Sequence, residues 1–106
     1  MEILFDHGTP EPLRGALVGH RVTTAHELGW ARLSNGELLK AAEGRFDAMV
    51  TTDQSLGYEQ NLEGRHLAIL VLSTTSWPRI KKHAGLVLAT VNELRPGMYV
   101  VLEIPV

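Results

Sequence analysis

Residues 66–72, HLAILVL, form the strongest apolar run in the chain, and they restrict its fold more than any other feature. A run of this kind is typical of a strand that is buried on both faces, as in parallel sheets with helices on both sides. Four further runs fit strands of the same sheet, and they are ILF at 3–5, RVTTA at 21–25, FDAMVTT at 46–52 and MYVVLEI at 98–104.

Helical patterns separate these strands. The three predicted helices span residues 9–19, 34–44 and 77–94. Thr9 and Pro10 suit the N-cap and the first position of the first helix, and Gly44 suits the end of the second. The third rests on apolar residues at helical spacing. Two segments are less distinct: residues 27–33 are ambiguous, and residues 55–65 are a loop or a short helix.

Strands that alternate with helices along the chain indicate an α/β domain. We therefore expect one domain over residues 1–106, built as a three-layer α/β/α sandwich around a mostly parallel five-stranded sheet. Right-handed crossovers would place helices on both faces of this sheet. The direction of the last strand, 98–104, stays open.

Composition narrows the class of protein. Hydrophobic residues make up 44% of the chain and charged residues 21%, which is ordinary for a globular domain. The chain has no cysteine, which excludes disulfides and thiolate metal sites. We see no signal peptide or membrane-spanning run, and we expect a cytoplasmic protein without a membrane partner. The net charge of −2 means that binding to nucleic acid would need a local basic patch.

Two predicted strands end in an aspartate, Asp6 and Asp53. If the strands are parallel, both carboxylates lie at the same edge of the sheet, where α/β proteins form their sites. Between neighbouring strands they would be one or two strand spacings apart, each roughly 5 Å. Two negative charges at this distance stay ionised only beside a positive charge. The pattern therefore predicts a site for Mg²⁺ or Mn²⁺, which prefer oxygen ligands.

The start of the helix at 34–44 offers two more oxygen ligands. Glu37 is a candidate third carboxylate, and Asn35 is a candidate amide ligand. The predicted metal ligands are thus Asp6, Asn35, Glu37 and Asp53, of which the three carboxylates are the predicted catalytic residues. Each has a structural alternative. Ser34 and Glu37 also fit a capping box, Asn35 also fits a residue at the start of the helix, and the two aspartates also fit Asx turns or helix caps.

Three segments resemble the PIN-like proteins of the DUF5615 group. They are ILFDHGTPEPLRGAL, LSNGELLKAAE and FDAMVTTDQSLGYEQNL, in this order over nearly the whole chain, and the segment that ends in TTD is the most specific. These proteins look like compact relatives of PIN-domain ribonucleases, which include the toxins of bacterial toxin–antitoxin pairs. The resemblance implies a PIN-like fold.

The resemblance also assigns roles to residues. Asp6 and Asp53 match the family's strand-end aspartates. The family has an acidic residue where this chain has Asn35, and often a second aspartate where it has Ser55. Glu37, or more distantly Glu27, would compensate for these changes.

The activity that the resemblance implies is cleavage of RNA phosphodiester bonds with Mg²⁺ or Mn²⁺ as cofactor. The implied partners are an RNA substrate, an antitoxin protein and a second copy of the chain. A basic cluster at Arg79, Lys81, Lys82 and His83 is a candidate for positioning phosphate, although such a run is most often a solvated helix face. His7, next to Asp6, is a further candidate at the cleft.

Two other classes of function remain open. One is a non-catalytic PIN-like module that binds RNA or protein and has a degenerate acidic site, which Asn35 and Ser55 favour. The other is an α/β domain in which Asp53 accepts a phosphoryl group. That chemistry would want paired acids near the first strand and a lysine after the strand at 66–72, but His7 follows Asp6 and STT follows the strand.

Overall fold

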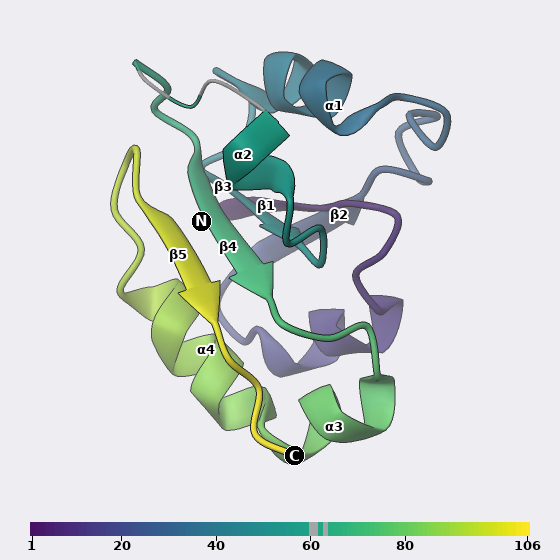
Figure 1. Ribbon diagram of the computed structural model, residues 1–106, viewed down its shortest axis with the longest axis vertical. Helices are drawn as coiled ribbons and strands as arrows, with labels where there is room; N and C mark the ends of the chain where they lie inside the picture. The colour runs from purple at the N-terminus through teal and green to yellow at the C-terminus, as the bar shows by residue number, and fades with distance from the viewer. Residues whose placement is uncertain (60–61, 63) are drawn as a thin grey trace.

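The computed structural model describes residues 1–59, 62 and 64–106, and it is an α/β fold around one five-stranded sheet (Figure 1). The strands lie in the order β2-β1-β3-β4-β5, and every neighbouring pair is parallel. Their bounds are β1 Glu2–Phe5, β2 Arg21–Thr24, β3 Ala48–Thr51, β4 Ala68–Leu72 and β5 Tyr99–Leu102. The five predicted strands are confirmed, and the direction of the last one is settled as parallel.

Helical segments connect the strands. They are the 3₁₀ helix η1 Glu11–Ala16 and the α-helices α1 Asn35–Ala42, α2 Leu56–Glu59, α3 Trp77–Lys82 and α4 Ala84–Asn92. Residues 25–29 form turns rather than a helix or strand. No helix in the described part of the chain is long and apolar enough to cross a membrane.

The core lies on both faces of the sheet, because successive side chains of a strand point to opposite sides. Ile3 and Phe5 join one buried cluster, and Leu4 between them joins the other. The first cluster includes residues of η1, α3 and α4, and the second includes residues of α1 and α2. All five residues of β4 are buried. The expectation that helices cover both faces of the sheet is thereby confirmed.

Local sequence explains the position of α1. The Ser34 side chain accepts a hydrogen bond from the Glu37 amide at 3.2 Å, and the Glu37 carboxylate accepts one from the Ser34 amide at 2.9 Å. This is the predicted capping box. Gly44 has a φ of +83°, a conformation that favours glycine, and it follows the helix end as predicted. The cap fixes where the Asn35 side chain leaves the helix.

The first helical segment differs from the prediction. It is a 3₁₀ helix with Pro10 at the N-cap position, so the expected α-helix with a Thr9 cap is wrong. The Thr9 hydroxyl instead lies 2.7 Å from Oδ1 of Asp6 and 2.9 Å from the Val50 carbonyl. The local pattern predicts that the Thr9 side chain caps the helix, but two strong acceptors at the end of the sheet bind its hydroxyl instead.

The predicted continuous helix over 77–94 is divided into α3 and α4. His83 lies between them with φ −119° and ψ 25°, outside helical geometry. Ile80 in α3 and Val87 and Val91 in α4 nevertheless enter the same core cluster. The apolar spacing therefore continues across the break, which is why the pattern predicts one helix.

Candidate functional site

The candidate site lies at the carboxyl ends of β1 and β3, where the order of the sheet reverses. The chain passes from β1 to β2 on one side and later to β3 on the other. Ligands of open α/β sheets bind at such a switch point. Asp6 directly follows β1, and Asp53 lies two residues after β3. The sheet therefore places both strand-end aspartates at one edge and on neighbouring strands.

Asp6 is buried, with 5% of its surface exposed. Oδ1 accepts a hydrogen bond from the Thr9 amide at 3.1 Å and lies 2.7 Å from the Thr9 hydroxyl. Oδ2 accepts a hydrogen bond from the Thr51 hydroxyl. The contact with the Thr9 amide is the local turn that the structural alternative for Asp6 predicts. These donors hold the carboxylate in one orientation.

Asp53 is half-buried and is held from two sides. Its Oδ1 accepts hydrogen bonds from the Ser55 hydroxyl at 2.7 Å and the Ser55 amide at 3.0 Å. Its Oδ2 accepts one from the side-chain amide of Asn35. The Ser55 hydroxyl, more than any other group, lowers the pKa of the Asp53 carboxyl below its ordinary value, although burial opposes this. Asp53 is therefore ionised at neutral pH.

Thr51 connects the two carboxylates. Its buried hydroxyl accepts a hydrogen bond from the Asp53 amide at 3.0 Å and donates one to Asp6. A single hydroxyl thus couples the loop after β3 to the carboxylate after β1. Asp6, Thr51 and Asp53 are therefore joined at this edge by a continuous path of hydrogen bonds.

Glu37 lies apart from this path. Its carboxylate is exposed and takes part in the capping box. The bond from the Ser34 amide, first among the causes, lowers the pKa of Glu37. The structure therefore places the Asn35 side chain beside Asp53, whereas the Glu37 side chain caps the start of α1.

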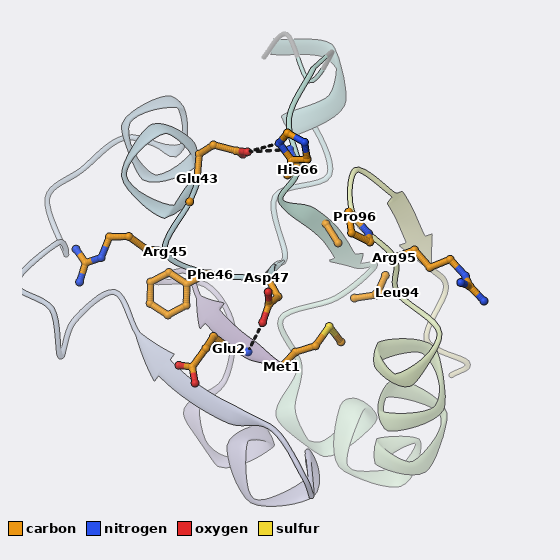
Figure 2. A pocket seen from close by; sticks show the side chains of 12 residues that line it. Met1, Glu2, Glu43, Arg45, Phe46, Asp47, His66, Leu94, Arg95 and Pro96 are labelled. Atoms are coloured by element: carbon orange, nitrogen blue, oxygen red, sulfur yellow. Dashed lines mark hydrogen bonds and ion pairs between the residues drawn. The ribbon is translucent and has the colours of Figure 1, made fainter.

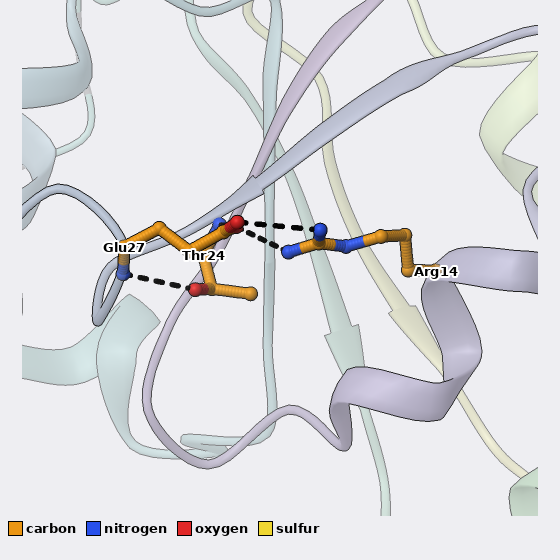
Figure 3. A network of polar contacts seen from close by, with 3 residues as sticks. All are labelled: Arg14, Thr24 and Glu27. Carbon is orange, nitrogen blue, oxygen red and sulfur yellow. Dashed lines mark hydrogen bonds and ion pairs between the residues drawn. The ribbon is translucent and has the colours of Figure 1, made fainter.

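Glu27, the more distant candidate, is paired with Arg14. Figure 3 shows the Arg14 guanidinium facing the Glu27 carboxylate, while the Glu27 amide donates to the Thr24 hydroxyl at 3.1 Å. The hydrogen bond from Arg14 is the main reason why the pKa of Glu27 is lowered. This pair joins η1 to the turn after β2, so Glu27 already has a cationic partner.

A cavity of about 540 Å³ opens at this edge. Asp6, His7 and Glu27 line it, and so do His26 and Trp77. His7 therefore lies at the cavity, as the sequence predicts. Trp77 also packs against the core cluster, so it serves both as an anchor and as a wall of the cavity.

The basic cluster begins two residues after Trp77, which lines the cavity and is the first residue of α3. The Arg79 guanidinium donates to the Ile104 carbonyl at 2.7 Å and is half-buried, so it has a structural contact. Lys81 and Lys82 are exposed near the end of α3. These two lysines are the members of the cluster that have their charge in solvent.

Among the described residues, the structure contains no group of three or more histidine, aspartate or glutamate side chains arranged to hold a metal ion. The edge therefore offers two carboxylates, held by the hydroxyls of Thr9, Thr51 and Ser55, by two backbone amides and by the side-chain amide of Asn35. The sequence pattern does not assign Thr9, Thr51 and Ser55 to these carboxylates. The spacing of Thr51, Asp53 and Ser55 at every second residue is the signal that could have linked them.

A second cavity, of about 580 Å³, lies at the opposite end of the sheet (Figure 2). At its rim the Glu43 carboxylate accepts a hydrogen bond from the His66 amide at 2.8 Å, and Asp47 accepts one from the Glu2 amide at 2.8 Å. Both carboxylates thus fasten the amino ends of strands. Trp30 lies in the same layer as α1, packs edge-on against Phe46 and lies under Arg45, as a packing role predicts.

No protein-family model matches the chain, and searches of curated proteins and of solved structures found no match.

Proposed function

We propose that the chain is a PIN-like domain that binds Mg²⁺ or Mn²⁺ through Asp6 and Asp53 and cleaves RNA phosphodiester bonds. The observation that carries the proposal is the convergence of two strand-end carboxylates at the switch point of the sheet, joined by the Thr51 hydroxyl. The resemblance of the segments around Asp6 and Asp53 to PIN-like ribonucleases supports the same site. An antitoxin and a cytoplasmic location belong to this proposal.

The two carboxylates fit an ion that keeps most of its water. A carboxylate oxygen has two acceptor positions. Oδ2 of Asp6 accepts one hydrogen bond, from Thr51, and Oδ2 of Asp53 accepts one, from Asn35. Each oxygen thus keeps a position for a cation. Mg²⁺ is commonly held by one or two carboxylates, with water and substrate phosphates as its other ligands.

The other predicted ligands have different roles in this proposal. Asn35 directs its NH₂ group at Asp53, so it orients the carboxylate rather than ligating the ion. Glu37 caps α1. Thr9 and Ser55 hold the Oδ1 atoms of Asp6 and Asp53. The proposed metal ligands are therefore reduced to the two aspartates.

A bound divalent ion would lower the pKa of its water and neutralise charge on the phosphate. The chain's own residues fix the carboxylates and supply the walls of the cavity beside Asp6. Lys81 and Lys82, on the helix that begins at the cavity, are the exposed cations available to attract an RNA backbone.

Cleavage of a labelled single-stranded RNA tests the proposal. The wild type is compared with Asp53→Asn and Asp47→Asn, with Mn²⁺ and with EDTA. Asp53 follows the carboxyl end of β3 and Asp47 precedes its amino end, so the second variant is a matched control on the same strand. The proposal predicts cleavage by the wild type and Asp47→Asn with Mn²⁺, and its loss in Asp53→Asn and in EDTA.

A second function is favoured by the contact between Asn35 and Asp53. A neutral donor stands where PIN-like nucleases have an acidic residue, and it satisfies Asp53 without a cation. This arrangement suits a non-catalytic module that binds RNA or protein. RNA binding that is unaffected by EDTA, with no cleavage by any variant, would support this function over the first.

A further inference from the structure

The outer edge of β5 is apolar and exposed. β5 is the last strand in the order of the sheet, and Figure 1 shows it at the margin beside β4. Tyr99 is 37% exposed and Val101 is 49% exposed, although both are large apolar residues in a strand. Met98, just before the strand, is also 37% exposed. An exposed apolar edge strand is a template for pairing with another strand.

The backbone N–H and C=O groups on the open edge of β5 are oriented for such pairing. The Ile69 amide donates to the Met98 carbonyl at 2.8 Å, and the Ser73 amide donates to the Leu102 carbonyl at 3.1 Å. Even-numbered residues of β5 therefore face β4. Alternate residues of a parallel strand direct their backbone groups to opposite sides. The N–H and C=O groups of Tyr99 and Val101 thus point to the open edge.

The other edge of the sheet is different. β2 begins with Arg21, which pairs with Glu2 at 3.5 Å, and it continues through Val22 to two threonines. Charged and polar residues protect an edge from pairing. From Met98 to Leu102 the chain has no charged residue. The apolar edge is therefore specific to β5.

We propose that β5 pairs antiparallel with β5 of a second copy of this chain and forms a continuous ten-stranded sheet. With the two-fold axis at Val100, Tyr99 of each copy lies opposite Val101 of the other. Both residues present their backbone groups to the partner, so each pair exchanges two hydrogen bonds. Pairs of an aromatic and a β-branched residue are favourable across strands. This inference is independent of the proposed nuclease activity.

Charge favours a second copy in the antiparallel direction. Arg95 precedes the strand and Glu103 follows it, and both are exposed. Antiparallel pairing brings Arg95 of each copy to the end of the strand that carries Glu103 of the other. Parallel pairing would place like charges together, which is destabilising. The edge is therefore complementary to itself.

A hollow of about 410 Å³ adds space for the partner. Gln54 and Gly57 line it together with Tyr99 and Val101. The same two side chains of a second copy would lie on this face and extend the apolar surface beside the hollow. Because all strands within a copy are parallel and the two copies run antiparallel, the two Asp6–Asp53 edges would face in opposite directions.

Sedimentation equilibrium of the purified chain, from micromolar to submillimolar concentration, measures the association. The proposal predicts a monomer–dimer equilibrium that ends at twice the 11.7 kDa mass of one chain. Val101→Lys places a charge on the open edge and should weaken the dimer at least tenfold. Val18→Lys changes a valine that is 74% exposed elsewhere and should leave the dimer unchanged. A monomeric wild type, or a Val101→Lys variant that still dimerises, would overturn the proposal.

Disulfide trapping tests the register. The chain has no cysteine, so Val100→Cys gives a single thiol at the proposed axis. Val22→Cys is the matched control, because Val22 lies on the other edge strand and also packs, half-buried, against the same core cluster. Under mild oxidation Val100→Cys should give a covalent dimer at least tenfold faster than Val22→Cys. Equal rates would contradict pairing through β5.

Discussion

The side-chain amide of Asn35 donates a hydrogen bond to Oδ2 of Asp53. This contact joins the first turn of α1 to the carboxyl end of β3, and it places a neutral donor beside an ionised carboxylate. A carboxylate in place of the amide would repel Asp53 unless a cation lay between them. In the proposed metal site, Asn35 would therefore determine how strongly this edge depends on a bound ion.

Asn35→Asp should make the fold depend on a divalent ion. Without metal, loss of a hydrogen bond to a charged group and the added repulsion should lower the free energy of unfolding by about 2 kcal/mol. Mn²⁺ should restore this loss and raise the melting temperature of Asn35→Asp more than that of the wild type. Thermal unfolding with and without Mn²⁺ measures both effects.

Asn35→Ala is the control, because it removes the donor without adding charge. Its melting temperature should respond to Mn²⁺ no more than that of the wild type. An equal response of the alanine and aspartate variants would show that the position does not face a cation site.

Thr51→Val should destabilise the protein even though the two side chains have nearly the same shape. The change removes the partner of Oδ2 of Asp6 and the acceptor for the Asp53 amide. A buried polar group left without a partner costs about 1–3 kcal/mol. Urea unfolding measures this loss. Thr23→Val on β2 should change the stability by less than half as much, because the hydroxyl of Thr23 has no hydrogen-bond partner among the described residues.

Gly8 and Thr52 should be coupled energetically. A Cβ at position 8 would lie 2.4 Å from the Thr52 hydroxyl oxygen, so Gly8→Ala forces one of them to move. Such overpacking costs about 1–3 kcal/mol. Thr52→Ala removes the obstructing atom, so the double variant should recover most of the loss. Additive effects in a double-mutant cycle, measured by urea unfolding, would rule out this steric contact.

Glu43 should make stability depend on pH. Its carboxylate accepts hydrogen bonds from the amides of His66 and Leu67, and the first of these is the main reason why its pKa is lowered. An unfolded glutamate titrates near pH 4.3. The stabilising contribution is therefore complete above about pH 5 and is lost as the pH falls through the lower pKa of the folded state.

Glu43→Ala tests this pH dependence. At pH 7 the variant should unfold at a lower urea concentration than the wild type, and the difference should shrink between pH 5 and pH 3. A difference that stays constant over this range would show that the ionised carboxylate is not what stabilises the wild type. Glu93→Ala, at an exposed residue just after α4, is a control for general effects of charge.

Local patterns account for the elements and for part of the site. The sequence predicts the apolar run of β4, the strand-end positions of Asp6 and Asp53, and the Ser34–Glu37 capping box. All three can be predicted because burial, strand ends and caps depend on neighbours in the sequence. Local sequence does not predict the position of Thr51 between the two carboxylates. Its two hydrogen bonds depend on the pairing of β1 with β3, which joins segments 45 residues apart.

The differences between the sequence predictions for Thr9 and Asn35 and the structure have the same physical origin. Thr9 satisfies the rules for a helix cap, but the Asp6 carboxylate and the Val50 carbonyl engage its hydroxyl. The sequence pattern predicts Asn35 as an oxygen ligand, but its NH₂ group donates to the ionised Asp53 carboxylate instead. In both cases a charged or carbonyl oxygen brought close by the sheet outweighs a local preference.

Calorimetric titration with Mn²⁺ tests the central claim most directly. The wild type should bind Mn²⁺ in the micromolar to submillimolar range, Asp47→Asn should bind it equally well, and Asp53→Asn should not bind it while circular dichroism shows that it is folded. Absence of binding to the folded wild type, both alone and with a non-cleavable RNA, would contradict a metal site at Asp6 and Asp53.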